Sequence, residues 1–242
     1  MNFAFAERPF SGRTFRPRPE IHLDTDSKTL IIATPWGPRE AARKVINRMT
    51  DYLALAREDS EATSVFQKMS CLSTSANRLR TATLLANETL FREDNREEYR
   101  SGVEIFAGIL EEDEFVWLQS GNPQILLSRV GKKLLPLGSQ IDLSFDFSEG
   151  NEILSGLPSQ LMGLDSSLNL SINSFRAHAG DKLALISHSH LPEGIFAIQR
   201  DQISVDGLSR AVAAATPNHA FWVGVLQIGD PPGQHAAPQG RS

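Results

Sequence analysis

The 242-residue chain contains one cysteine and no long apolar run, and each shortage excludes a class of protein. The single Cys71 excludes an internal disulfide and a cysteine-rich metal site, so we expect a small buried side chain in a reducing compartment. No apolar run approaches the length that spans a bilayer, and residues 1–10 lack the features of a signal peptide. We therefore expect a cytoplasmic protein with no membrane contact.

Positive charge is also scarce, because 24 Lys and Arg residues face 29 Asp and Glu residues, giving a formal net charge of −5. Such a chain lacks the broad basic surface of nucleic-acid-binding proteins, so no nucleic-acid partner is expected. Residues 1–18 are the exception, with the arginines Arg8, Arg13, Arg16 and Arg18 against the single acid Glu7. We expect a flexible basic arm there, a single domain over residues 19–230 and a flexible tail over residues 231–242.

Apolar periodicity predicts alternating strands and helices. The expected strands cover residues 29–33, 102–110, 114–120, 123–129, 181–187 and 221–228. The expected helices cover residues 39–57, 75–91 and 205–215. Short connections between the second, third and fourth strands are typical of an antiparallel meander, and they make the acidic run 111–114 a solvated hairpin tip rather than a metal site. The sum is an α/β protein with an extensive, largely antiparallel sheet and paired helices.

Several motifs stand in a fixed order along this framework. They are Ala33-Thr-Pro-Trp-Gly-Pro38 before a helix, GVEIFAGIL, SGNPQILLSR, LLPLGS, AGDKLALIS followed by His188-Ser189, and PNHAFWVGVLQIG. In order and spacing they resemble the metal-dependent protein phosphatases of the PPM (type 2C) family, over residues 20–229. The resemblance implies a four-layer α-β-β-α sandwich in which two mainly antiparallel sheets are flanked by helices. Fold does not imply function, so the activity is a separate question.

The family's chemistry uses two divalent ions, usually Mn²⁺ or Mg²⁺, which bridge a water that attacks the phosphorus of phosphoserine or phosphothreonine. Two adjacent dications need several anionic oxygen ligands. The resemblance places the family's metal-binding positions at Glu20, Thr34, Pro35, Asn122, His188, Ser189, Asn218 and His219. Of the five positions that are acidic in the family, Glu20 alone keeps a carboxylate. Metal binding is therefore expected to be lost, leaving no metal cofactor and no catalytic residue.

The resulting hypothesis is a pseudophosphatase that acts by binding a protein, such as a kinase or a signalling regulator. Trp36 and Pro38 are expected to plug the former metal pocket. The alternative is a weak or atypically metallated phosphatase that uses Glu20, His188 and His219, because imidazole suits zinc. A Ser-His-Asp hydrolase built from Ser187 or Ser189 has no nucleophile elbow around either serine.

Overall fold

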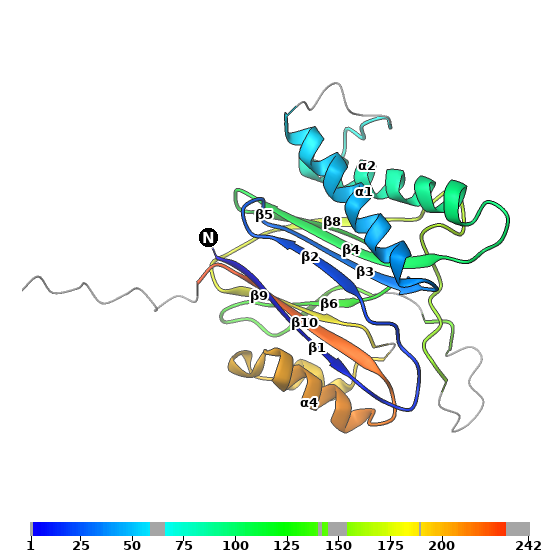
Figure 1. Cartoon of the computed structure of the whole chain (residues 1–242). Coiled ribbons are helices and arrows are strands. Elements are labelled where there is room, and N and C mark those ends of the chain that lie inside the picture. The colour runs from blue at the N-terminus through cyan, green and yellow to red at the C-terminus, as the bar shows by residue number, and fades with distance from the viewer. Residues whose placement is uncertain (1, 59–65, 140–141, 145–153, 189, 231–242) are drawn as a thin grey trace, which may run out of the picture.

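The structure is a computed structural model that describes residues 2–58, 66–139, 142–144, 154–188 and 190–230. Two five-stranded antiparallel sheets lie face to face, and helices cover the outer face of each sheet (Figure 1). These four layers are the α-β-β-α sandwich that the family resemblance implies. None of the described helices is long and apolar enough to cross a membrane.

Sheet B has the strand order β2-β3-β4-β5-β8. Its strands are β2 (Glu20–Asp24), β3 (Thr29–Trp36), β4 (Gly102–Glu111), β5 (Glu114–Ser120) and β8 (Ser171–Arg176). The helices α1 (Arg39–Glu58) and α2 (Thr74–Thr89), with the π-helical turn η1 (Leu90–Asp94), cover its outer face (Figure 1). Alternation along β3 sorts the core, because Ile31 and Ala33 pack under the helices whereas Leu30 and Ile32 face the other sheet.

Sheet A has the strand order β1-β10-β9-β6-β7. Its strands are β1 (Phe3–Phe10), β6 (Gln124–Ser128), β7 (Leu135–Gly138), β9 (Asp181–Ile186) and β10 (Phe221–Ile228). Helix α4 (Val205–Ala215) and the short 3₁₀ segments η2 (Glu193–Ala197) and η3 (Arg200–Gln202) complete the described elements. Apolar residues of α4 such as Leu208 and Val212 pack with Phe221 and Val223 on the outer face of sheet A.

Two expectations about connectivity are wrong. The flexible basic arm is instead largely a strand, because β1 pairs with β10 along its whole length and Phe3 is buried between the sheets. The expected three-stranded meander ends after β5: β4 and β5 form a hairpin, but β6 pairs with β7 and β9 in sheet A. The chain therefore changes sheets at residues 121–123, where the sequence shows only a turn signal.

Other expectations have mixed outcomes. The helices expected over residues 39–57, 75–91 and 205–215 are confirmed within two residues at each end, and the acidic run 111–114 does form the β4–β5 hairpin turn. Cys71, expected to be buried, is exposed, because it lies in the loop before α2 rather than on a packed face. The tail expected over residues 231–242 lies outside the described residues.

Candidate functional site

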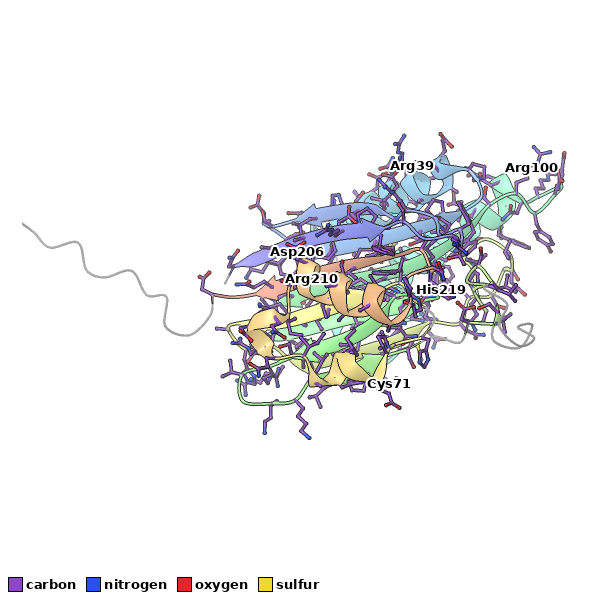
Figure 2. The ribbon with its side chains drawn as sticks, turned by 90° about the horizontal axis from the view of Figure 1, so that it is seen from below. Arg39, Cys71, Arg100, Asp206, Arg210 and His219 are labelled. Carbon is purple, nitrogen blue, oxygen red and sulfur yellow. The ribbon has the colours of Figure 1, made fainter. Side chains whose placement is uncertain are left out.

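The candidate site lies at one end of the sandwich, where β3 and β9 end and β4 and β10 begin. Thr34 lies opposite Glu104 in the β3–β4 ladder, and Asn122 lies in the connection from β5 to β6. His188 follows β9 and His219 precedes β10. Figure 2 shows His219 beyond the end of α4 that is remote from Asp206, where the helix leads into β10.

At the centre of this end is a buried carboxylate that the family resemblance does not supply. The Glu104 side chain has no exposed surface, and it shares its side of β4 with Phe106, which faces the opposite sheet. Its Oε1 accepts from the backbone N–H of Asn122 at 3.0 Å and from the Asn122 side-chain amide at 3.2 Å. Its Oε2 accepts from the Arg16 guanidinium at 2.6 Å and from the Trp36 indole N–H at 3.0 Å. Four donors therefore fill the acceptor positions of one carboxylate.

Arg16 reaches Glu104 from the strap, which we define as residues 11–19 between β1 and β2. The Arg16 side chain is 4% exposed, and its guanidinium carbon lies 5.4 Å from the centre of the Trp36 ring. The strap also covers the segment before β10, because Arg13 and Thr14 donate backbone N–H groups to the Asn218 carbonyl at 2.6 and 3.2 Å. The Thr14 hydroxyl accepts from the backbone N–H of Ala220 at 2.9 Å. The strap is thus fixed to both sheets at the candidate site.

The two histidines lie together in this cluster. The ring centres of His188 and His219 are 5.3 Å apart in an edge-to-face arrangement, and His188 is 4% exposed. Burial, together with charge repulsion from His219, His190 and Arg16, lowers the pKa of His188 to about 4, although the hydrogen bond from His190 opposes the shift. His188 is therefore neutral at pH 7. Its Nδ1 accepts from the backbone N–H of His190 at 3.0 Å, so its single ring proton is on Nε2.

Several buried polar atoms at this end have no hydrogen-bond partner among the described residues. They are Arg16 Nε, Asn122 Oδ1, His188 Nε2 and His219 Nδ1. Buried polar atoms are normally paired, so a group of unpaired ones needs an explanation. The cluster therefore combines a carboxylate whose acceptor positions are filled with unpartnered polar atoms on Arg16, Asn122 and the two histidines.

The structure corrects the place of Glu20. It lies opposite Ala33 in the β2–β3 ladder and therefore faces α1, the same side as Ala33. Its carboxylate accepts from Arg39 and lies 3.6 Å from Arg43, both on α1. Thr34 and Glu104 face the opposite side of sheet B, because neighbouring residues of a strand alternate. The hypothesis that Glu20 joins His188 and His219 in one site is therefore wrong.

The remaining predicted positions are partly brought together. Asn218 contributes its backbone carbonyl to the strap, Pro35 is buried in β3, and Ser189 lies outside the described residues. Of the two residues expected to plug the former metal pocket, Trp36 donates to Glu104, whereas Pro38 is exposed directly before α1.

The side chains present do not fit a centre of two dications. Glu104 is already neutralised by Arg16, and its two oxygens are occupied by donors. Over the described ranges, no group of three or more His, Cys, Asp or Glu residues is placed to hold a metal ion. Hard cations require anionic oxygens, and this cluster places one carboxylate beside one guanidinium.

Sequence reasoning missed the Glu104–Arg16 pair, although a signal existed. Glu104 is the one charged residue in the apolar stretch GVEIFAGIL, residues 102–110, and a charge in a buried strand requires a partner. The partner was not identifiable from spacing, because Arg16 is 88 residues away.

No family model matches the chain, and no curated protein sequence matches it significantly. Solved structures do. The Mycobacterium tuberculosis serine/threonine phosphatase PstP/Ppp is 13% identical, with 95% of this chain and 100% of that chain covered and a TM-score of 0.64. PppA, described as a key regulatory component of T6SS in Pseudomonas aeruginosa, is 15% identical over 94% and 98% of the two chains, with a TM-score of 0.62. The PPM Ser-Thr phosphatase MsPP from Mycobacterium smegmatis is 17% identical over 93% and 98%, also with a TM-score of 0.62. At these identities the likeness establishes the PPM phosphatase fold.

Proposed function

We propose that this chain is a PPM-fold protein without phosphatase activity, which acts by binding another protein. The observation that carries the proposal is the buried ion pair of Glu104 and Arg16, whose side chains are 0% and 4% exposed. The positive charge beside the buried Glu104 carboxylate of the candidate site comes from the chain itself. A metal ion would have to displace Arg16 and leave its guanidinium without a partner, which is costly in a buried site.

The charge balance of the candidate site supports this proposal. Arg16 and Glu104 cancel, His188 is neutral at pH 7, and Thr34, Asn122 and Asn218 carry no charge. Two adjacent dications need several anionic ligands to offset their mutual repulsion and to hold a bound hydroxide near neutral pH. The candidate site has no net negative charge, so it can neither offset the repulsion between two dications nor hold a bound hydroxide near neutral pH.

The surface of the strap supports a protein partner. Phe15 is 66% exposed, and the side chains of Arg13 and Arg18 are exposed and form no ion pair with any described residue. A cavity of about 210 Å³ lies beside them, with walls from the strap and from the first residues of β10. A partner segment with carboxylates and an apolar side chain complements this surface. By analogy of fold, the partner is a kinase or a signalling regulator.

Activity assays test the catalytic half of the proposal. The full chain is incubated with p-nitrophenyl phosphate and with a phosphoserine peptide, each with Mn²⁺ or Mg²⁺, and we expect no hydrolysis above that of a Glu104→Gln, His188→Ala double variant. That variant controls for a contaminating phosphatase. Metal-dependent hydrolysis by the native chain that the double variant lacks would overturn the proposal and establish the weak-phosphatase alternative.

A quantitative affinity pull-down tests the binding half. We expect partners captured by the native chain to be depleted with an Arg13→Glu, Arg18→Glu double variant, because both charges on the strap are reversed. Arg96→Glu, on an exposed position after η1, is the matched control. Equal capture by the native chain and both variants would show that the strap does not bind the partner.

A further inference from the structure

A separate cavity lies in the helical layer over sheet B. Its volume is about 250 Å³, and its walls come from the last turns of α1, the first half of α2 and the segment 68–72 that leads into α2. The two helices cover the face of sheet B opposite to the one on which Glu104 lies (Figure 1). The cavity is therefore independent of the candidate site and of the function proposed for it.

The wall of this cavity is held in place by hydrogen bonds. The Asn77 side chain accepts from the backbone N–H of Met69 at 2.9 Å and donates to the carbonyls of Met69 and Leu72 at 3.0 and 3.1 Å. Ser73 caps α2 by accepting from the N–H of Ala76 at 3.3 Å. A cavity with a fixed wall needs little ordering when a ligand enters, which favours binding.

Two polar groups on α2 retain hydrogen-bonding capacity at the cavity. Thr81 lines it and is 4% exposed, and its hydroxyl makes no hydrogen bond within the described part of the chain. Arg78 also lines it, and its buried Nε has no partner there. The contact of Arg78 with Glu111 is long, at 3.5 Å, and the Glu111 carboxylate also accepts from Ser75. Arg78 and Thr81 are three residues apart on one helix and therefore face the same side.

The electrostatics at this point favour an anion. Arg78 lines the cavity, and the first turn of α2 contains no acidic residue. The partial positive charge at the N-terminus of this 16-residue helix is therefore not offset by its own first turn. The rest of the lining is mostly apolar, including Tyr52, Ala56 and Leu72.

We propose that this cavity binds a small organic anion with an apolar body. Arg78 and Thr81 contact the anionic group, and the apolar body lies against Ala56, Tyr52 and Leu72. The size is adequate, since a dry cavity of about 150 Å³ in another protein holds a benzene ring. Charge and lining together select an amphipathic carboxylate over a neutral or fully polar ligand.

The test uses 3-phenylpropionate as the probe and 3-phenylpropanol as its neutral counterpart. Each is titrated into the isotopically labelled full chain, and amide chemical shifts are followed. We expect saturable shifts confined to residues 68–81 and the last turns of α1 for the acid, and binding about tenfold weaker for the alcohol, because a hydrogen bond to a charged group is lost. Absence of saturable binding by the acid up to about 10 mM, or equal binding of acid and alcohol, would overturn the proposal.

Matched variants locate the site. Arg78→Gln is expected to raise the Kd for the acid about tenfold and Thr81→Val several-fold, whereas Arg78→Lys keeps the charge and has a smaller effect. Glu111→Gln, which removes the competing carboxylate, is expected to leave the Kd unchanged or lower it. Arg92→Gln, beyond α2 in η1 and paired with Glu88, is the remote control. If each variant retains the native unfolding temperature and Arg78→Gln binds the acid as the native chain does, the proposed site is wrong.

Discussion

The two ends of the sandwich each contain a buried carboxylate paired with an arginine, yet the two ends differ in completeness. At one end Glu104 pairs with Arg16, which belongs to the strap between the sheets. At the other end Asp181, the first residue of β9, is 1% exposed and pairs with Arg129. Arg129 directly follows β6, the strand that pairs with β9 in sheet A. Asp181 also accepts from the backbone N–H of His178 at 2.9 Å.

The difference lies in the surroundings of the two pairs. Among the described residues, no buried polar atom of the Asp181 or Arg129 side chain is unpartnered. One such atom lies beside this pair, on Arg200, whose Nε has no partner while its guanidinium donates to the Gly180 carbonyl at 2.6 Å. Around Glu104, by contrast, four such atoms remain on Arg16, Asn122, His188 and His219. A complete pair is typical of a structural feature, and an incomplete cluster is typical of a place where local rules are relaxed for function. The Glu104 end is therefore the stronger candidate for a functional site.

The largest expected effect on the free energy of unfolding comes from substituting the arginine at each end. Arg16→Met leaves Glu104 fully buried without a cation, and we expect the free energy of unfolding to fall by about 3–5 kcal/mol. Arg129→Met is expected to cost less, about 2 kcal/mol, because the Arg129 side chain is 24% exposed and water reaches the site. Urea unfolding of both variants at pH 7 measures the two losses.

A double variant completes this test. Adding Glu104→Gln to Arg16→Met removes the buried charge, and most of the lost stability should return. Equal losses for Arg16→Met and Arg129→Met, or no recovery in the double variant, would contradict the view that Glu104 depends on the strap.

The second effect is a dependence on pH at the Glu104 end. Burial lowers the pKa of His188 to about 4 in the folded protein, whereas the unfolded value is 6.5. The folded state therefore favours neutral His188, so its contribution to stability is fully present above pH 6.5 and is lost as the pH falls toward 4. The shift corresponds to about 3 kcal/mol, which is an order-of-magnitude value.

Unfolding measured between pH 7 and pH 4 checks this prediction. His188→Gln should flatten the fall in stability across that range, and His178→Gln, an exposed histidine at the Asp181 end, should leave the slope unchanged. The acid-induced loss that carboxylates cause is common to all three proteins. Identical slopes for native and His188→Gln protein would show that His188 is not held neutral.

The sequence revealed the central strands and the helices because each of them carries its pattern locally, whereas the arrangement in two sheets was implied by the order of the motifs. Strands such as β3 and β9 are apolar and bounded by turn residues, and α1 and α4 show apolar stripes at helical spacing. It did not reveal β1, because Glu7 and Arg8 interrupt its apolar residues and further arginines follow, which suggests a solvated segment. The strands β2, β7 and β8 were not among the expected strands either. The sequence did not reveal the change of sheet at residues 121–123 either, since Gly-Asn also marks an ordinary hairpin.

The candidate site was predictable in part for similar reasons. The order of motifs placed Thr34, Asn122, His188 and His219 at strand ends, and these ends do meet. The side on which Glu20 lies depends on the pairing register of an edge strand, which periodicity alone specifies poorly. The Glu104–Arg16 pair depends on a contact across 88 residues, which no local pattern encodes.

The smallest of the three effects concerns how closely the strap lies against the segment before β10. A Cβ atom added at Gly12 would stand 2.4 Å from the His219 carbonyl carbon and 2.5 Å from the Asn218 carbonyl oxygen. These are backbone atoms, and the Arg13 N–H donates to the same Asn218 oxygen at 2.6 Å, so the clash can be relieved only if the strap moves.

We expect Gly12→Ala to lower the free energy of unfolding by about 2 kcal/mol. Gly194, whose added Cβ meets nothing within 4 Å, is the matched control, and Gly194→Ala should change stability by less than about 0.5 kcal/mol. If thermal or urea unfolding finds the two alanine variants equally stable, the strap is loosely attached. A metal ion could then displace Arg16 from Glu104 without the cost that a rigid strap imposes.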